Sequence, residues 1–191
     1  MHYPLKLCSL RSWTPQDAAA VQRYAHNRNI WRNLRDAFPH PYGLEDARAF
    51  LNHAIGEKPE TIFAIASPAE AIGCISLRLG RDVHARTAEL GFWLGEPFWG
   101  RGIMSEAVAG FTRYAFEAYD VVRIYAESFA SNPASARVLE KAGFSCEGCL
   151  RSNVIKDGQI LDSLMYACIR GPTDGRHREG TRKRKGAKDG A

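Results

Sequence analysis

The chain has 191 residues, of which 45% are hydrophobic and 25% are charged. Both fractions are ordinary for a globular protein with one sizeable core, which excludes a fibrous or wholly disordered chain. No apolar run reaches the roughly 18 to 20 residues of a membrane span, and the first residues lack a charged start followed by an apolar stretch, so we expect no secretion signal. The five cysteines form no regular framework, which favours free thiols in a cytoplasmic setting.

The net charge of +5 gathers at the end of the chain. From Gly171 onward there are seven basic and three acidic residues, whereas the preceding part nearly balances 19 basic against 18 acidic residues. This end has no large apolar residue, so we predict a folded domain over 1–171 and a basic, disordered tail over 172–191. The run Arg182–Lys185 is a candidate contact for RNA or a ribosomal partner. A solvated extension is the simpler interpretation.

Two helices are predicted in the first third of the chain. Thr14 and Pro15 are typical of a helix start, with Asp17 in the capping-box position, and this helix is predicted to run to about Asn27. A loop rich in aromatic residues and proline follows. Apolar residues at helical spacing then predict a second helix over 44–55.

Strands and helices alternate in the rest of the chain. The predicted elements are strands over 61–67, 71–79 and 87–95, a helix over 103–118, a strand over 121–129, a helix from Asn132 to Gly143, and a hairpin over 149–169. Asp157-Gly158 is a strong turn signal for that hairpin. The unit of strand, helix and strand predicts a right-handed crossover between parallel strands. The fold class is therefore α+β, a single domain with a mixed sheet flanked by helices.

A glycine loop lies between the third predicted strand and the following helix. Gly100 and Gly102 surround Arg101 there. Glycine lets the backbone approach a ligand closely, and a helix start offers unpaired N–H groups and partial positive charge. The loop therefore predicts a diphosphate site, with Arg101 placed to help a further phosphate; a plain tight turn is the competing interpretation.

Other phosphate motifs fit this loop poorly. A dinucleotide fingerprint needs an acidic residue at the end of the next strand, whereas Asp120 precedes that strand. A P-loop needs Gly-Lys followed by Ser or Thr, which is absent from the sequence.

The surrounding motifs are more specific. The stretches "AELGFWL", "PFWGRGIMSEAV" and "NPASARVLEKAGF", with the earlier "FPHPYGLEDARAFL", resemble the GNAT superfamily of acetyl-CoA-dependent N-acetyltransferases. They are most similar to the branch that contains the ribosomal-protein N-terminal acetyltransferases RimJ and RimL. The resemblance covers about residues 6 to 170. It implies a twisted mixed sheet that splays open between two neighbouring parallel strands, with acetyl-CoA in the split.

The resemblance also implies positions for the cosubstrate. The backbone of Phe92, Trp93 and Leu94 is expected to bind the pantetheine arm and the acetyl carbonyl. Loop N–H groups are expected to hold the pyrophosphate, those of Trp99, Gly100, Arg101, Gly102, Ile103 and Met104. Asn132 is expected near the pantetheine, Ser135 near the sulfur, and Lys141 near the adenine end.

The chain departs from the wider superfamily at two places. Trp99 and Met104 stand where the loop of the superfamily begins with Gln or Arg and ends with Gly or Ala. Main-chain binding is expected to tolerate this change. Leu139 stands where many members have a tyrosine as general acid, so the acid is Ser135, a water molecule or nothing.

The expected reaction is direct attack of an amine on the thioester, and the acceptor is a protein N-terminus or a small amine such as a polyamine or an aminoglycoside-like drug. Glu89 and Glu127, on neighbouring predicted strands, are the candidate bases. Each also has a purely structural interpretation, as does Ser135. Phe38, His40 and Tyr42 are candidates for the acceptor pocket, because the family places this loop over the acetyl end; packing within the loop is the alternative.

Two further function classes stay open beside the enzyme. One is a non-catalytic acyl-CoA-binding sensor, suggested by Leu139. The other is a module that binds RNA or the ribosome through the basic tail. A second copy of the chain is a further candidate partner. Cys146 and Cys149 lack the second pair that a zinc site needs, so no metal is expected.

Overall fold

The computed structural model describes residues 1–171. Its strands are β1 (His2–Pro4), β2 (Ser9–Arg11), β3 (Ile62–Ala66), β4 (Ala71–Leu79), β5 (Thr87–Leu94), β6 (Arg123–Phe129), β7 (Ser145–Lys156) and β8 (Gln159–Ile169). Its helices are α1 (Ala18–Ala25), α2 (Arg28–Trp31), α3 (Leu44–Gly56), α4 (Ile103–Ala118) and α5 (Pro133–Lys141). Short 3₁₀ turns are η1 (Pro15–Asp17), η2 (Asp82–His84) and η3 (Glu96–Phe98). The predicted tail over 172–191 lies outside the described residues.

The described strands form one mixed sheet in the order β1-β2-β3-β4-β5-β6-β8-β7. β5 and β6 are parallel, and every other neighbouring pair is antiparallel. Helix α4 connects the parallel pair, as the crossover pattern predicts. The expected single domain with a mixed sheet flanked by helices is confirmed.

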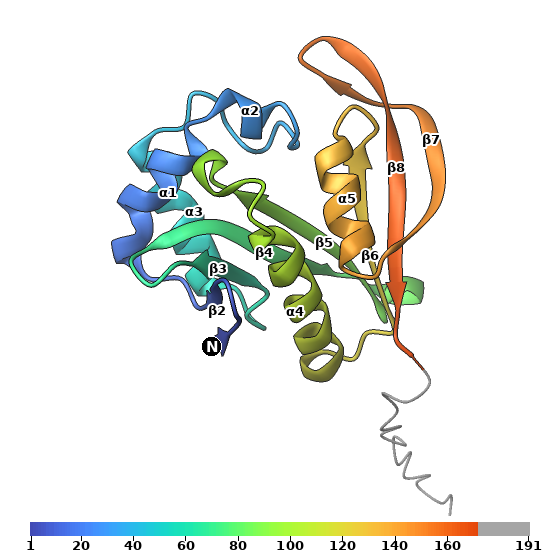
Figure 1. Ribbon diagram of the computed structural model, residues 1–191, viewed down its shortest axis with the longest axis horizontal. Helices are drawn as coiled ribbons and strands as arrows, with labels where there is room; N and C mark the ends of the chain where they lie inside the picture. The colour runs from blue at the N-terminus through green and yellow to red at the C-terminus, as the bar shows by residue number, and fades with distance from the viewer. Residues whose placement is uncertain (172–191) are drawn as a thin grey trace, which may run out of the picture.

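Helices cover both faces of the sheet (Figure 1). On one face, Phe111 of α4 and Leu139 of α5 are buried against strand residues such as Phe63. On the other face, α1 and α3 bury a smaller cluster that includes Leu51 and Ala64. Phe63 and Ala64 are adjacent, and their side chains enter different cores because successive strand residues point to opposite faces.

Local signals set several element ends. The Thr14–Asp17 capping box is present, with the Thr14 N–H 2.9 Å from the Asp17 carboxylate. Gly143 has φ +91° and ends α5, since the Phe144 N–H reaches back to the Leu139 carbonyl. Asp157 and Gly158 both have positive φ in the tight turn between β7 and β8. These three sequence predictions are confirmed.

The first predicted helix is present as η1 followed by α1, and it ends two residues before the expected Asn27. Helix α1 ends at Ala25, and Asn27 caps the separate short helix α2, with its side chain accepting from the N–H groups of Asn29 and Ile30. The short strands β1 and β2 were not predicted. The final hairpin is longer than expected, because β7 begins at Ser145.

Candidate active site

A cleft opens where β5 and β6 separate. The two strands pair at only three positions, Thr87 with Arg123, Ala88 with Ile124, and Glu89 with Tyr125. Both then continue, to Leu94 and Phe129, without further pairing to each other. A cleft of about 1440 Å³ lies between them and the surrounding loops. The splayed parallel pair expected from the resemblance is therefore present.

The glycine loop lines this cleft through Gly100 and Gly102 and leads into α4. Both glycines have positive φ, +74° and +79°, and Gly102 is the N-cap of α4. Within residues 1–171, the backbone N–H groups from Gly100 to Ser105 have no hydrogen-bond acceptor. A row of unpaired N–H groups at a helix start fits a diphosphate. The loop therefore fits the cosubstrate that the resemblance implies.

The side chains of Trp99 and Arg101, which belong to this loop, make different contacts. The Trp99 indole Nε1 donates to the Leu94 carbonyl at 2.7 Å, which ties the loop to the end of β5. Arg101 does not line the cleft, and its guanidinium carbon lies 5.9 Å from the centre of the Phe98 ring. A direct contact between Arg101 and a phosphate stays a prediction.

The cleft side of β5 offers main-chain groups. No β6 residue pairs with Leu90, Phe92 or Leu94, and the Leu94 carbonyl already accepts from Trp99 Nε1. Phe92, Trp93 and Leu94 all line the cleft. Unpaired strand groups of this kind bind an extended ligand through its amides, which fits the expected pantetheine arm.

Helix α5 supplies the opposite wall. Asn132 caps it, its Oδ1 accepting from the Ser135 N–H at 3.3 Å and its Nδ2 donating to Ser135 Oγ at 2.9 Å. Asn132, Ser135 and Lys141 all line the cleft. Leu139 is only 1% exposed and belongs to the core. Its side chain has no hydroxyl group that could act as a general acid.

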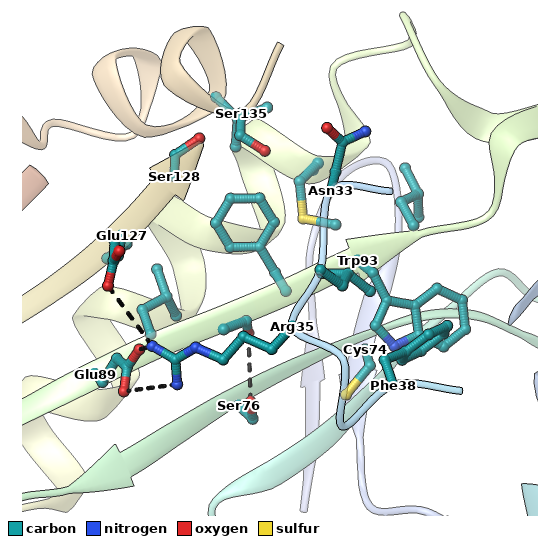
Figure 2. Close-up of a pocket in the computed structure, with 18 of the residues that line it drawn as sticks. Asn33, Arg35, Phe38, Cys74, Ser76, Glu89, Trp93, Glu127, Ser128 and Ser135 are labelled. Carbon is teal, nitrogen blue, oxygen red and sulfur yellow. Dashed lines mark hydrogen bonds and ion pairs between the residues drawn. The ribbon is translucent and has the colours of Figure 1, made fainter. Parts of the chain in front are cut away.

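The two candidate bases lie on either side of the strand split. Glu89 pairs with Tyr125, and Glu127 lies two residues further on, so both carboxylates project from the same face of the sheet. Arg35, from the loop after α2, forms an ion pair with Glu89 and lies 3.8 Å from Glu127 (Figure 2). Arg78 approaches Glu89 at 3.5 Å. Each carboxylate therefore faces at least one guanidinium.

Only one of the three predicted acceptor-loop residues lines the cleft. Phe38 does so, and it packs against Trp93 with ring centres 6.0 Å apart. Tyr42 is buried behind Phe38, and burial raises the pKa of its phenol, which keeps it neutral. His40 lies 5.6 Å from the ring of Trp31, outside the cleft.

Several cleft residues escaped sequence reasoning. Arg35, Asn153 and Cys74 line the cleft, but no motif marks them. Asn153 Nδ2 donates to Glu127 Oε1 at 2.7 Å. Burial raises the pKa of the Cys74 thiol to about 12, so this thiol is neutral and a poor nucleophile.

Residues 1–171 contain neither a cluster of metal-binding side chains nor a membrane-spanning helix. No group of three or more His, Cys, Asp or Glu side chains is placed to hold a metal ion. Cys146 and Cys149 are exposed free thiols on β7. Within the same residues, no helix has both the length and the apolar character needed to cross a membrane.

Comparison with known proteins identifies the family. A family model described as an acetyltransferase (GNAT) domain matches residues 8–145. YoaA of Bacillus subtilis, an uncharacterized N-acetyltransferase, is 31% identical over 173 residues, covering 84% of this chain and 92% of that protein. The ribosomal protein uS5-alanine N-acetyltransferase of Escherichia coli is 27% identical over 152 residues, covering 75% of this chain and 77% of that protein.

A solved structure agrees with this result. RimL, a ribosomal L7/L12 alpha-N-protein acetyltransferase in complex with coenzyme A, matches with a TM-score of 0.79 at 23% identity, covering 89% of this chain and 98% of that chain. This likeness shows the fold. Together with the family match, it places the chain in the GNAT family of N-acetyltransferases.

Proposed function

We propose that the chain transfers an acetyl group from acetyl-CoA to a primary amine, and that this amine is the N-terminus of a protein. The observation that carries the proposal is the cleft between β5 and β6, lined by unpaired loop N–H groups and by the Glu89 and Glu127 carboxylates. The names of two similar proteins support the acceptor class, since one specifies alanine of uS5 and the other the alpha-N position of L7/L12.

Main-chain groups do most of the work of holding the cosubstrate. The N–H groups of Gly100 to Ser105 bind the diphosphate, and the free edge of β5 at Phe92 to Leu94 binds the pantetheine arm. Asn132 lies on the facing wall, and Lys141 lies one helix length from it. Because few side chains are involved, Trp99 and Met104 are tolerated in the loop.

The carboxylates manage the proton of the acceptor. An N-terminal amine is largely protonated at neutral pH, since its pKa is about 7.7 to 8.0. It has to lose a proton before it can attack a carbonyl carbon. Glu89 or Glu127 accepts this proton, directly or through water. Both lie on the same face of the sheet at the point where the strands part.

The N–H groups on the cleft edge of β5 stabilise developing negative charge on the acyl oxygen, an effect of roughly 3 kcal/mol per donor. Acetyl-CoA supplies an activated acyl group whose leaving thiol has a pKa of about 8.5. A strong general acid is therefore dispensable, which is compatible with Leu139 in the core. Ser135 Oγ faces the cleft and is the candidate donor to the leaving sulfur.

Titration calorimetry of the full chain with acetyl-CoA and with coenzyme A is the first test. The acceptor test is mass spectrometry of peptides that begin with Ser, Ala or Met, compared with acetylated-N-terminus controls and a polyamine. Mass detection is preferable to thiol reagents, because the exposed Cys146 and Cys149 would react with them. Micromolar binding with acetylation of free N-termini is expected. Absence of binding would overturn the proposal.

The sensor function is a second candidate, which Leu139 favours. Its hydroxyl-free side chain replaces the usual acid of the family and is fully buried. Under this alternative, the chain binds acetyl-CoA as tightly but acetylates no peptide or amine of the panel.

A further inference from the structure

Arg35 occupies the space between the two carboxylates of the cleft. Its guanidinium points toward Glu89 and Glu127 in Figure 2, pairing with the first and lying 3.8 Å from the second. The carboxylates belong to different strands of the split sheet, whereas Arg35 comes from the loop between α2 and α3. One cation therefore bridges the two walls of the cleft from above the sheet.

The carboxylates are more buried than the cation that joins them. The side chains of Glu89 and Glu127 are 15% and 20% exposed, whereas that of Arg35 is 54% exposed. Water competes for the exposed guanidinium, which weakens the hold of the two carboxylates on it. The half-exposed Arg35 guanidinium can move into solvent and be hydrated there, but the carboxylates cannot follow it because they are fixed on strands.

Removal of Arg35 leaves one uncompensated negative charge. Glu89 keeps its contact with Arg78 at 3.5 Å. Glu127 keeps a neutral partner, the Asn153 amide, at 2.7 Å. The group of Arg35, Arg78, Glu89 and Glu127 is neutral as it stands, and it becomes a receptor for a single positive charge once Arg35 withdraws.

We propose that Arg35 sets the affinity for the acceptor by competing with the acceptor's ammonium group for Glu89 and Glu127. The acceptor amine arrives as a monocation and replaces the guanidinium between the carboxylates. This inference rests on the proposed acetyltransfer and assigns it a residue that determines specificity. An acceptor with a single positive charge is favoured. An acceptor with an acidic group beside the amine is disfavoured, because that group would be repelled by the two carboxylates.

Arg35→Ala is the direct kinetic test, with the best peptide acceptor of the panel. We expect the KM for that peptide to fall about two- to fivefold, which corresponds to loss of a weak ion pair, and kcat to change less than KM. Arg48→Ala is the matched control, because Arg48 is also a solvent-exposed arginine that forms an ion pair, with Glu45 at 2.6 Å, outside the cleft. It should leave both constants unchanged. A higher or unchanged KM in Arg35→Ala would overturn the proposal.

A second test needs no turnover. Guanidinium chloride at millimolar concentration should raise the Tm of Arg35→Ala above that in equal sodium chloride, because the ion refills the vacated place. The wild type and the double variant Arg35→Ala, Glu127→Gln should show no such rise. No difference between the salts for Arg35→Ala would refute the two-carboxylate receptor. Failure of the proposed function itself would appear separately, as absence of acetyl-CoA binding in calorimetry.

Discussion

Lys156 Nζ lies 2.6 Å from Oδ1 of Asp36, although 120 residues separate the two in sequence. The same nitrogen lies 3.8 Å from the centre of the Trp31 ring, and the lysine side chain is only 3% exposed. The tip of the β7–β8 hairpin is thus fastened to α2 and to the loop that carries Arg35. Residues of both segments line the cleft, so this contact fixes one side of its entrance.

Replacement of Lys156 by methionine should loosen this contact. The apolar stem is kept, but the ion pair and the contact of the cation with Trp31 are lost. We expect the free energy of unfolding to fall by about 1 to 2 kcal/mol, measured by urea denaturation. Amide exchange at residues 33–36 should also accelerate. Lys156→Arg is the control that keeps the charge, and equal loss in both variants would show that packing rather than charge holds the hairpin.

Gly102→Ala should weaken coenzyme binding. An added Cβ would meet only Leu7 Cδ1, at 3.6 Å, so space is sufficient. The residue has φ +79°, however, a conformation that costs an L-residue roughly 1 to 2 kcal/mol. We expect the Kd for acetyl-CoA in calorimetry to rise about tenfold, since the N–H groups that follow lose their alignment. Gly56→Ala, at a position with free space around it, is the control. Unchanged affinity would contradict the diphosphate role of this loop.

Asp17→Asn should change how stability depends on pH. Burial raises the pKa of Asp17, but hydrogen bonds from Arg11 and Thr14 outweigh burial, and the net pKa is lowered. A carboxyl group whose pKa is lower in the folded state stabilises the fold above its unfolded pKa of about 3.9. That contribution is lost as the pH falls through the folded pKa.

At pH 7 we expect Asp17→Asn to lose about 2 to 3 kcal/mol of unfolding free energy. The difference from wild type should shrink below about pH 4, as followed by denaturation at several pH values. Glu45→Gln, at an exposed carboxylate that pairs with Arg48, is the control. A difference that stayed constant down to the acid limit would show that the charge of Asp17 is irrelevant.

Ser135→Ala tests the candidate acid. The backbone N–H of residue 135 still donates to Oδ1 of the N-cap residue Asn132, so the free energy of unfolding should stay the same. If Ser135 protonates the leaving sulfur, kcat should fall roughly ten- to a hundredfold, the low end for general acids, because a thiolate leaves readily. The Kd for coenzyme A should change little. Ser131→Ala, on the exposed loop before α5, is the control, and an unchanged kcat in Ser135→Ala would remove this residue from the chemistry.

Local signals in the sequence predicted much of the fold. The Thr14–Asp17 box, the glycines of the loop and the Asp157-Gly158 turn act within a few residues, so the sequence alone is sufficient for them. The strands β1 and β2 are only three residues each, and β2 depends on a partner far along the chain, since Ser9 pairs with Ala66 of β3. No periodicity can be read from three residues.

The candidate site likewise has one part that the sequence predicts and another part that it does not. Backbone sites on β5 and in the glycine loop follow from elements that the sequence predicts. Arg35 does not, because its place depends on the next residue, Asp36, meeting Lys156 from the far end of the chain. His40 and Tyr42 were expected at the acceptor pocket, yet His40 packs against Trp31 and Tyr42 packs behind Phe38. The roles of all these side chains stay predictions.

β5 and β6 pair at only three positions, and this junction separates the strands that are synthesised first from those synthesised later. The first five strands are all antiparallel neighbours and lie before residue 95, whereas β6, β8 and β7 come after residue 122. On the ribosome, the first part can assemble while the second is still being made, and its last strand is then an open sheet edge. Open edges invite wrong partners. The edge that is free for the cosubstrate in the finished protein is therefore also open to mispairing in the growing chain.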